Sequence, residues 1–216
     1  MFPVKRPLTP RCTPPPIIAA IAQAAVNQGA VGVRIDTPAH ISRVRQQVSV
    51  PIIGLWKQQI PGSEVYITPQ FHHAQAIAEA GADLIAIDAT LRSRPQGETV
   101  ESLIRRIHQE LGKPVMADID TLEAAIAAET AGADLIGTTL YGYTAATRHL
   151  TPPGFELLSD WVQQGHIPVI CEGGIQTPAM ARQALELGAY AVVVGTAITG
   201  IDALVNAYCA ALRQPV

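Results

Sequence analysis

Short, continuous apolar runs recur along the chain, and each is followed by a longer stretch in which apolar residues are spaced as in a helix. Two kinds of residue introduce these runs. A glycine followed by alanine is typical of the left-handed residue that ends a helix, and a proline is tolerated as the first residue of a strand. We therefore expect strands after Gly29, Pro51, Gly81, Pro114, Gly132, Pro168 and Gly188.

Between and after these strands the pattern predicts helices. Several begin with a threonine that can cap the first turn, such as Thr37, Thr121 and Thr177. Proline follows Thr37 and Thr177 as the first helical residue, where its missing N–H costs nothing. The expected helices cover about residues 15–28, 38–48, 70–80, 99–111, 121–131, 154–164, 177–187 and 200–213.

The alternation of apolar strands with helices predicts a parallel sheet covered by helices, because strands buried on both faces lose the alternation of polar and apolar residues. Evenly spaced strands favour a barrel over an open doubly wound sheet, and no Gly-x-Gly-x-x-Gly fingerprint opens a helix. The expected fold class is α/β, a (β/α)8 TIM barrel whose first strand is atypical or missing. Residues 1–16 form a proline-rich segment in which no barrel strand can be placed. Residues 17–216 are expected to form the barrel domain, and either a strand is encoded upstream or the barrel is completed in another way.

Composition narrows the class of ligand. The chain has 216 residues, of which 48% are hydrophobic, so it can bury one sizeable core. The formal charge is −3 and the basic residues are scattered, which gives no electrostatic footprint for nucleic acid or for an anionic membrane surface. A small molecule is therefore the expected partner.

The cysteines and the apolar runs predict the compartment. Cys12, Cys171 and Cys209 lie far apart, without a Cys-x-x-Cys pair, so neither a disulfide framework nor a zinc site is expected. No apolar run reaches membrane-spanning length, and the start of the sequence lacks the apolar core of a secretory signal. A cytoplasmic protein is expected.

Polar residues that directly follow the strands are the candidate site residues, because barrels of this type build their active sites at the carboxyl ends of the strands. These residues mix cations, carboxylates, hydroxyls and glycines, a mixture that suits a charged, sugar-like substrate. The candidates are Arg34, Lys57, Asp88, Asp118, Thr138, Thr139, Glu172, Gly195 and Thr196.

The last two strands end in glycines. Glu172 is followed by Gly173 and Gly174, and Gly195 precedes Thr196. Backbone N–H groups freed of side chains near a helix start can bind a phosphate, which is the usual barrel phosphate site. The alternative is that these glycines serve tight turns between a strand and a helix.

Lys57 follows a strand that is expected to be buried. An amine held at such a strand end can lose its proton more easily through desolvation or through a neighbouring cation such as Arg34, and could then act as a base. The alternative is an ordinary surface lysine on a loop. Glu172 and Asp118 could be general acids or bases, metal ligands or hydroxyl-binding carboxylates.

A metal site is the weaker interpretation of these carboxylates. The six histidines fall in predicted helices or loops, mostly away from the strand ends, and supply no set of ligands. His72 and His73 are read as a solvated helix start. Asp88 and the nearby Arg92 can equally form a buried ion pair or contact a substrate.

One pair of motifs is more specific than a generic barrel requires: Gly-Thr-Thr-Leu-x-Gly-Tyr-Thr at 137–144 and a later Cys-Glu-Gly-Gly turn at 171–174. With these motifs, the chain resembles the N-acetylmannosamine-6-phosphate 2-epimerases. The matching segments run in order from about residue 17 to the end: 29–35, 50–57, 65–68, 85–95, 115–119, 132–144, 168–178 and 192–199.

The resemblance implies an isomerase of amino-sugar catabolism. Its substrate would be N-acetylmannosamine 6-phosphate, interconverted with N-acetylglucosamine 6-phosphate without a redox cofactor or a metal, and its assembly a homodimer. Lys57 would be the acid/base, and Glu172 would hold the sugar and assist the movement of the proton. The remaining residues would bind substrate, with the glycines at the phosphate: Arg34, Asp118, Thr138, Gly173, Gly174, Gly195 and Thr196.

The chain departs from the family pattern at three places. No strand ending in Cys-Gln opens the sequence, Gly200 stands where the family has an arginine, and Tyr141 replaces a small residue. Two alternatives follow. One is a catalytically impaired phosphosugar-binding member of the same superfamily. The other is a phosphate-binding barrel enzyme of the thiamine-phosphate synthase type, although the sequence shows no added acidic cluster to hold the metal and diphosphate of that class.

Overall fold

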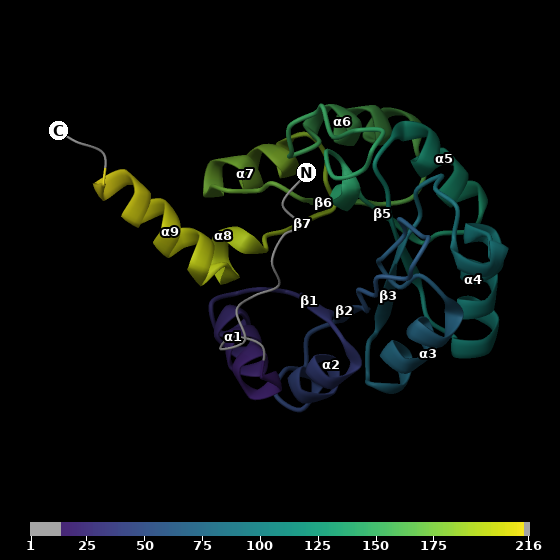
Figure 1. Cartoon of the computed structure of the whole chain (residues 1–216), viewed down its shortest axis with the longest axis horizontal. Helices are drawn as coiled ribbons and strands as arrows, with labels where there is room; N and C mark the ends of the chain where they lie inside the picture. The colour runs from purple at the N-terminus through teal and green to yellow at the C-terminus, as the bar shows by residue number, and fades with distance from the viewer. Residues whose placement is uncertain (1–13, 214–216) are drawn as a thin grey trace.

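Seven parallel strands follow one another around the sheet in chain order, with helices outside them (Figure 1). The computed structural model describes residues 14–213. Each strand pairs with the next one along the chain, which is the arrangement of a TIM barrel and confirms the expected fold class. The strands are β1 (Val33–Asp36), β2 (Ile52–Leu55), β3 (Leu84–Asp88), β4 (Val115–Asp118), β5 (Leu135–Gly137), β6 (Val169–Glu172) and β7 (Ala191–Val193).

The barrel is nearly closed. Within residues 14–213, β1 and β7 are the edges of the sheet, and no ladder joins them. Residues 1–13, where the sequence predicts an atypical or missing first strand, lie outside the described residues. Residues 14–16 of the predicted proline-rich segment lead into the first helix, and Pro15 and Pro16 occupy its first turn, where proline is tolerated.

The helices fall close to their predicted ranges. Thr37, Thr99, Thr121 and Thr177 each accept a hydrogen bond from the backbone N–H three residues on, which confirms the three predicted caps and adds Thr99. The helices are α1 (Pro15–Asn27), α2 (Pro38–Arg45), α3 (Phe71–Glu79), α4 (Val100–Arg106), α5 (Leu122–Thr130), α6 (Phe155–Gln164), α7 (Pro178–Glu186), α8 (Thr196–Thr199) and α9 (Ile201–Leu212). Short turns η2 (Pro95–Gly97), η3 (Ile107–Leu111, π-helical) and η4 (Thr138–Leu140) complete the described elements.

Strand periodicity divides the side chains into two cores. Outward residues such as Ile85 and Ile87 of β3 pack against the helices, and the intervening Ala86 lies inside the barrel. The inner core is small and holds Leu55, Ile67, Ala86, Met116, Leu140 and Ile170. Above it, the inward positions near the strand ends are polar, so the same alternation that builds the core also places charged side chains at the barrel mouth.

The structure corrects the expected environment of His73. The histidine pair was expected at a solvated helix start, but the side chain of His73 is buried and its ring makes an edge-on contact with Trp56. Burial lowers the pKa of His73 to about 4, and the neighbouring His72 adds to that shift. His73 therefore belongs to the packing between α3 and the end of β2.

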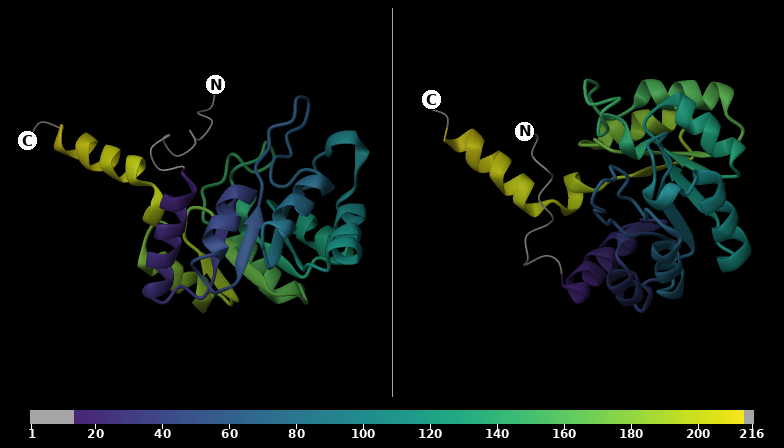
Figure 2. Two further views of the ribbon diagram at one scale, coloured as in Figure 1. Left: turned by 90° about the horizontal axis from the view of Figure 1, so that it is seen from below. Right: turned by 45° about the vertical axis from the view of Figure 1, so that its right-hand side comes forward.

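Helix α9 extends away from the barrel (Figures 1 and 2). Among residues 14–213, no residue of α9 is buried, and its large apolar side chains are exposed at Ile201, Leu204, Val205, Tyr208 and Leu212. Helix α9 therefore does not seal the barrel in this structure. None of the helices in residues 14–213 is both long and apolar enough to span a membrane.

Gly54 allows α2 and α3 to approach β2 closely. A Cβ atom at this position would lie 2.3 Å from Ile77 Cγ2 and 2.6 Å from Ala82 Cβ. We expect Gly54→Ala to lower the free energy of unfolding by about 1–3 kcal/mol, because the packed helices must shift. Urea unfolding measures this loss, and Gly32→Ala is the control, since a Cβ there lies at 3.4 Å from Pro51 O. Equal stability of the two variants would contradict this packing argument.

Candidate functional site

A buried ion-pair cluster occupies the centre of the barrel mouth. Arg34 of β1 binds Asp118 of β4 with both terminal nitrogens, at 2.5 Å between Nη2 and Oδ2 and 3.0 Å between Nη1 and Oδ1. The same Nη1 lies 2.8 Å from Oε2 of Glu172, on β6. Side-chain exposure is 6% for Arg34, 0% for Asp118 and 16% for Glu172. Three residues that the sequence placed on separate strand ends therefore meet at one point.

Glu172 is a buried carboxyl with a raised pKa. Burial raises its pKa to about 7, although the charges of Arg34 and Lys57 oppose this shift, and the nearby Asp118 carboxylate adds to it. Oε2 accepts no hydrogen bond in the described structure, so its contact with Arg34 is an ion pair without hydrogen-bond geometry. Glu172 is therefore available in both the neutral and the charged form near neutral pH.

Two adjacent threonines have different roles. Thr139 donates to Asp118 Oδ1 at 2.7 Å and so faces the ion-pair cluster. Thr138 is buried, and its hydroxyl donates to the carbonyl oxygen of Glu172 and accepts from the N–H of Glu172, each at 3.0 Å. These two bonds tie the Thr138 side chain to β6, and the predicted contact of Thr138 with substrate stays a prediction.

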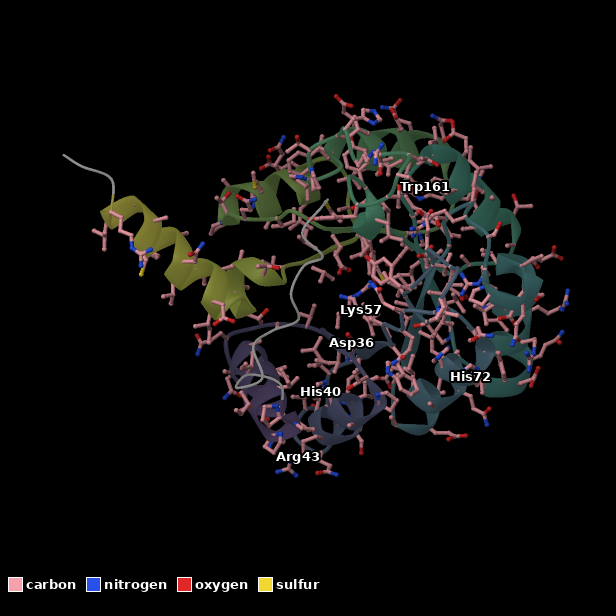
Figure 3. All side chains as sticks on the ribbon, in the orientation of Figure 1. Asp36, His40, Arg43, Lys57, His72 and Trp161 are labelled. Atoms are coloured by element: carbon pink, nitrogen blue, oxygen red, sulfur yellow. The ribbon has the colours of Figure 1, made fainter. Side chains whose placement is uncertain are left out.

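Lys57 lies at the mouth directly after β2 (Figure 3). Its backbone N–H donates to Asp36 Oδ1 at 3.0 Å, and Lys57 forms an isolated antiparallel bridge with Ile67. The residue is exposed, yet its charge acts on the carboxyls of both Asp36 and Glu172. The exposure of Lys57 agrees with the alternative of a surface lysine, whereas the backbone hydrogen bond to Asp36 places the residue at the barrel mouth.

The glycines after β6 are required by the backbone. Gly173 and Gly174 have φ angles of +98° and +73°, which favour glycine. A Cβ at Gly174 would lie 2.5 Å from Pro152 Cβ. Gly195, in contrast, has open space where a side chain would lie, and Thr196 begins the four-residue helix α8. A short extra helix beside these loops is where barrels of this type bind phosphate.

Asp88 forms a structural ion pair. Its buried carboxylate accepts from Arg92 Nη2 at 2.7 Å and from Thr90 Oγ1 at 2.8 Å, so the ion-pair alternative for Asp88 is the observed one. Arg94 donates to the carbonyl oxygens of Asp88 and Thr68. Two cavities of about 330 and 370 Å³ flank this loop, away from Lys57 and Glu172.

Sequence reasoning missed two polar residues near the cluster. Asp36 shares the inner face of β1 with Arg34, a position that strand alternation could have revealed. Tyr66 packs on the inner core, and burial raises the pKa of its hydroxyl to about 12, with Asp118 and Asp88 adding to that shift. No signal in the sequence marks Tyr66, because it belongs to a loop that returns to the barrel.

In residues 14–213, no group of three or more His, Cys, Asp or Glu residues is arranged to hold a metal ion.

The raised pKa of Glu172 predicts a pH-dependent stability. Because the folded-state pKa of about 7 lies above the ordinary value of 4.5, the folded protein retains a proton that the unfolded chain loses. This contribution is present below pH 4.5 and is lost as the pH rises through 7. We expect Glu172→Gln to remove this dependence, which amounts to at most about 3 kcal/mol.

Urea unfolding at a series of pH values measures the difference between the two proteins. Glu186→Gln is the control, because Glu186 is an exposed carboxylate on α7 that pairs with Arg182. Parallel stability curves for the wild type and Glu172→Gln would contradict the assignment of the raised pKa to Glu172.

The comparisons with known proteins concern nearly the whole chain. Residues 18–214 match the family described as "Putative N-acetylmannosamine-6-phosphate epimerase". A protein of Thermosynechococcus vestitus carrying the corresponding 2-epimerase name is 63% identical over 199 residues, which cover 92% of this chain and 86% of that protein. A relative of the same name from Listeria welshimeri is 45% identical over 186 residues, which cover 85% and 79% of the two chains.

Solved structures agree on the fold. The N-acetylmannosamine-6-phosphate 2-epimerase of Clostridium perfringens is 39% identical, with a TM-score of 0.89, and the match covers 95% of this chain and 88% of that one. A thiamine phosphate pyrophosphorylase of Pyrococcus furiosus is 20% identical, with a TM-score of 0.60, over 88% and 83% of the two chains. This second likeness shows the barrel fold alone.

Proposed function

The chain belongs to the N-acetylmannosamine-6-phosphate epimerase family, and on that premise we propose that it interconverts N-acetylmannosamine 6-phosphate and N-acetylglucosamine 6-phosphate in amino-sugar catabolism. The observation that carries this proposal is that Lys57, directly after β2, and Glu172, at the end of β6, both lie at the barrel mouth, where the charge of Lys57 acts on the Glu172 carboxyl. Inversion at C2 requires a group that removes a proton and a group that returns one to the opposite face. The lysine and the carboxyl with a pKa of about 7 are proposed to be these two groups.

The proton steps balance between these two side chains. The neutral amine of Lys57 takes the C2 proton of the open-chain sugar, and the electron pair moves to the carbonyl oxygen O1. The carboxylic acid of Glu172 then gives its proton to C2 from the other face. Lys57 loses its extra proton to solvent and Glu172 regains one, which restores the starting state. The charges of Arg34 and of protonated Lys57 offset the negative charge that develops on O1.

Other residues would hold the substrate. Asp118, fixed by Arg34 and Thr139, is proposed to accept a hydrogen bond from a sugar hydroxyl. The phosphate is proposed to bind the backbone N–H groups of Gly173, Gly174 and Gly195 with Thr196. The support is that Gly173 and Gly174 follow β6, which carries Glu172, and that Gly195 and the start of α8 follow the neighbouring strand β7.

The reaction is tested by isotope exchange. We expect the purified protein, incubated with N-acetylmannosamine 6-phosphate in deuterium oxide, to form the second epimer and to place deuterium at C2 of both sugars. Lys57→Ala is expected to reduce the rate by at least about 100-fold, because the base is lost. Nuclear magnetic resonance of the C1 and C2 protons follows both changes.

Lys113→Ala provides the matched control, since Lys113 precedes β4 at the opposite end of the barrel and its replacement should leave exchange unchanged. Sugar binding without exchange would instead support a catalytically impaired phosphosugar-binding member. Undiminished exchange in Lys57→Ala would contradict the assignment of Lys57 as the base.

We further propose that a second copy of the chain covers α9, in keeping with the homodimer that the family resemblance implies. The support is a helix whose Leu204, Val205 and Tyr208 are 40%, 55% and 73% exposed, although apolar faces of this kind are normally buried. Light scattering after gel filtration should give twice the mass of the chain. Leu204→Asp should shift the protein toward monomer, whereas Asp202→Asn on the same helix should not. A wild-type monomer at all concentrations would contradict this proposal.

A further inference from the structure

We propose that Asp36 is a positioning residue for Lys57: its carboxylate replaces a missing backbone acceptor and thereby fixes where the lysine leaves β2. The inference rests on the proposed role of Lys57 as the acid/base. Among residues 14–213, Asp36 forms no hydrogen bond with the ion-pair cluster or with the glycine turns.

The ladder between β1 and β2 shows what Asp36 replaces. Asp36 is in register with Leu55, and the N–H of Thr37 donates to Leu55 O at 2.9 Å. In a regular parallel ladder the next bond would run from the N–H of Lys57 to the carbonyl of Thr37. That carbonyl accepts from Ile41 at 3.0 Å instead, as the first bond of α2. The N–H of Lys57 donates to Asp36 Oδ1 at 3.0 Å in place of the ladder bond.

The turn after Asp36 is strained and held in place. Thr37 has a φ angle of +76°, a left-handed conformation that is costly for a non-glycine residue. Its Oγ1 lies 2.9 Å from His40 Nδ1, and that nitrogen also lies 2.9 Å from the carbonyl oxygen of Asp36. The first turn of α2 thus holds the chain in the conformation that turns the carboxylate of Asp36 toward Lys57.

The other side of Lys57 is held by the returning loop. Its bridge to Ile67 is flanked by two backbone hydrogen bonds, from Gln58 N to Tyr66 O and from Thr68 N to Trp56 O, each at 2.9 Å. With Asp36 on one side and this loop on the other, the backbone of Lys57 is fixed from two directions. Figure 3 shows Asp36 and Lys57 next to each other on the inner side of the barrel.

Charge supports the same pairing. The charged groups that act on the Asp36 carboxylate are Lys57, His40 and Arg34, and the charge of Lys57 also acts on Glu172. The lysine is therefore electrostatically coupled to carboxyls on β1 and β6. A lysine whose backbone is fixed is presented to the substrate from one direction, which is the condition for removing a proton from one face of C2.

The test compares Asp36→Ala with Asp36→Asn. Alanine removes the acceptor of the Lys57 N–H, whereas asparagine retains an oxygen at the same place. We expect Asp36→Ala to lower kcat about 10- to 100-fold with KM changed less than about 2-fold, because the base is misplaced while the binding groups remain. Asp36→Asn should recover kcat to within about 5-fold of the wild type.

The structure offers a matched control at the opposite end of β2. Asp83 Oδ2 accepts from the N–H of Ile52 at 2.8 Å and pairs with Arg45, so Asp83→Ala removes the same kind of backbone bond, together with an ion pair, far from Lys57. It should lower the thermal midpoint at least as much as Asp36→Ala and leave kcat unchanged.

Three results would overturn the inference. They are an unchanged kcat in Asp36→Ala, an equal loss of kcat in Asp83→Ala, and a failure of Asp36→Asn to recover activity. Lys57→Ala, measured alongside, separates this inference from the proposed function. If Lys57→Ala is inactive and Asp36→Ala is not impaired, the positioning role of Asp36 alone fails; if Lys57→Ala remains active, the assignment of the base fails with it.

Discussion

Arg34 joins two carboxylates at the centre of the barrel mouth, and the arrangement of the site depends on this cation. Charges removed from water are strongly unfavourable unless they are paired, and Asp118 is completely buried. The guanidinium satisfies both oxygens of Asp118 and leaves Glu172 with an ion pair that does not overcome the effect of its burial. The side chain of Arg34 thus links β1, β4 and β6. It also leaves Glu172 as a carboxyl that can exchange a proton near neutral pH.

Small side chains around this cation make the cluster possible. A Cβ at Gly137 would lie 2.4 Å from Met116 Cε and 2.9 Å from Asp118 Oδ1. There is therefore no room for a side chain on β5 where this strand faces the cluster. Thr139 completes the hydrogen bonding of Asp118, and Thr138 fixes the backbone that carries Glu172. The mouth is therefore preorganised by short, buried side chains, whereas the exposed Lys57 is held through its backbone.

Much of this architecture follows from local patterns. The glycines and prolines that introduce the strands, the threonine caps and the apolar runs predicted the seven strands and most helices. Strand ends such as Arg34, Lys57, Asp118 and Glu172 could be singled out because a barrel gathers the carboxyl ends of its strands. His73 was misread, since its burial depends on a helix packing that no local pattern records. Asp36 was overlooked although the alternation along β1 places it beside Arg34.

The sequence by itself determined the order of the elements, the strand ends that carry polar residues and the membership of the epimerase family. The tertiary structure alone decided which of the inward groups meet: Arg34 and Asp118 are 84 residues apart and come together through the stagger of β1 against β4. It also decided that a carboxylate on β1 replaces a backbone acceptor for Lys57. The physical reason is that periodicity fixes the direction of a side chain, whereas contact across a barrel depends on the register of every intervening strand.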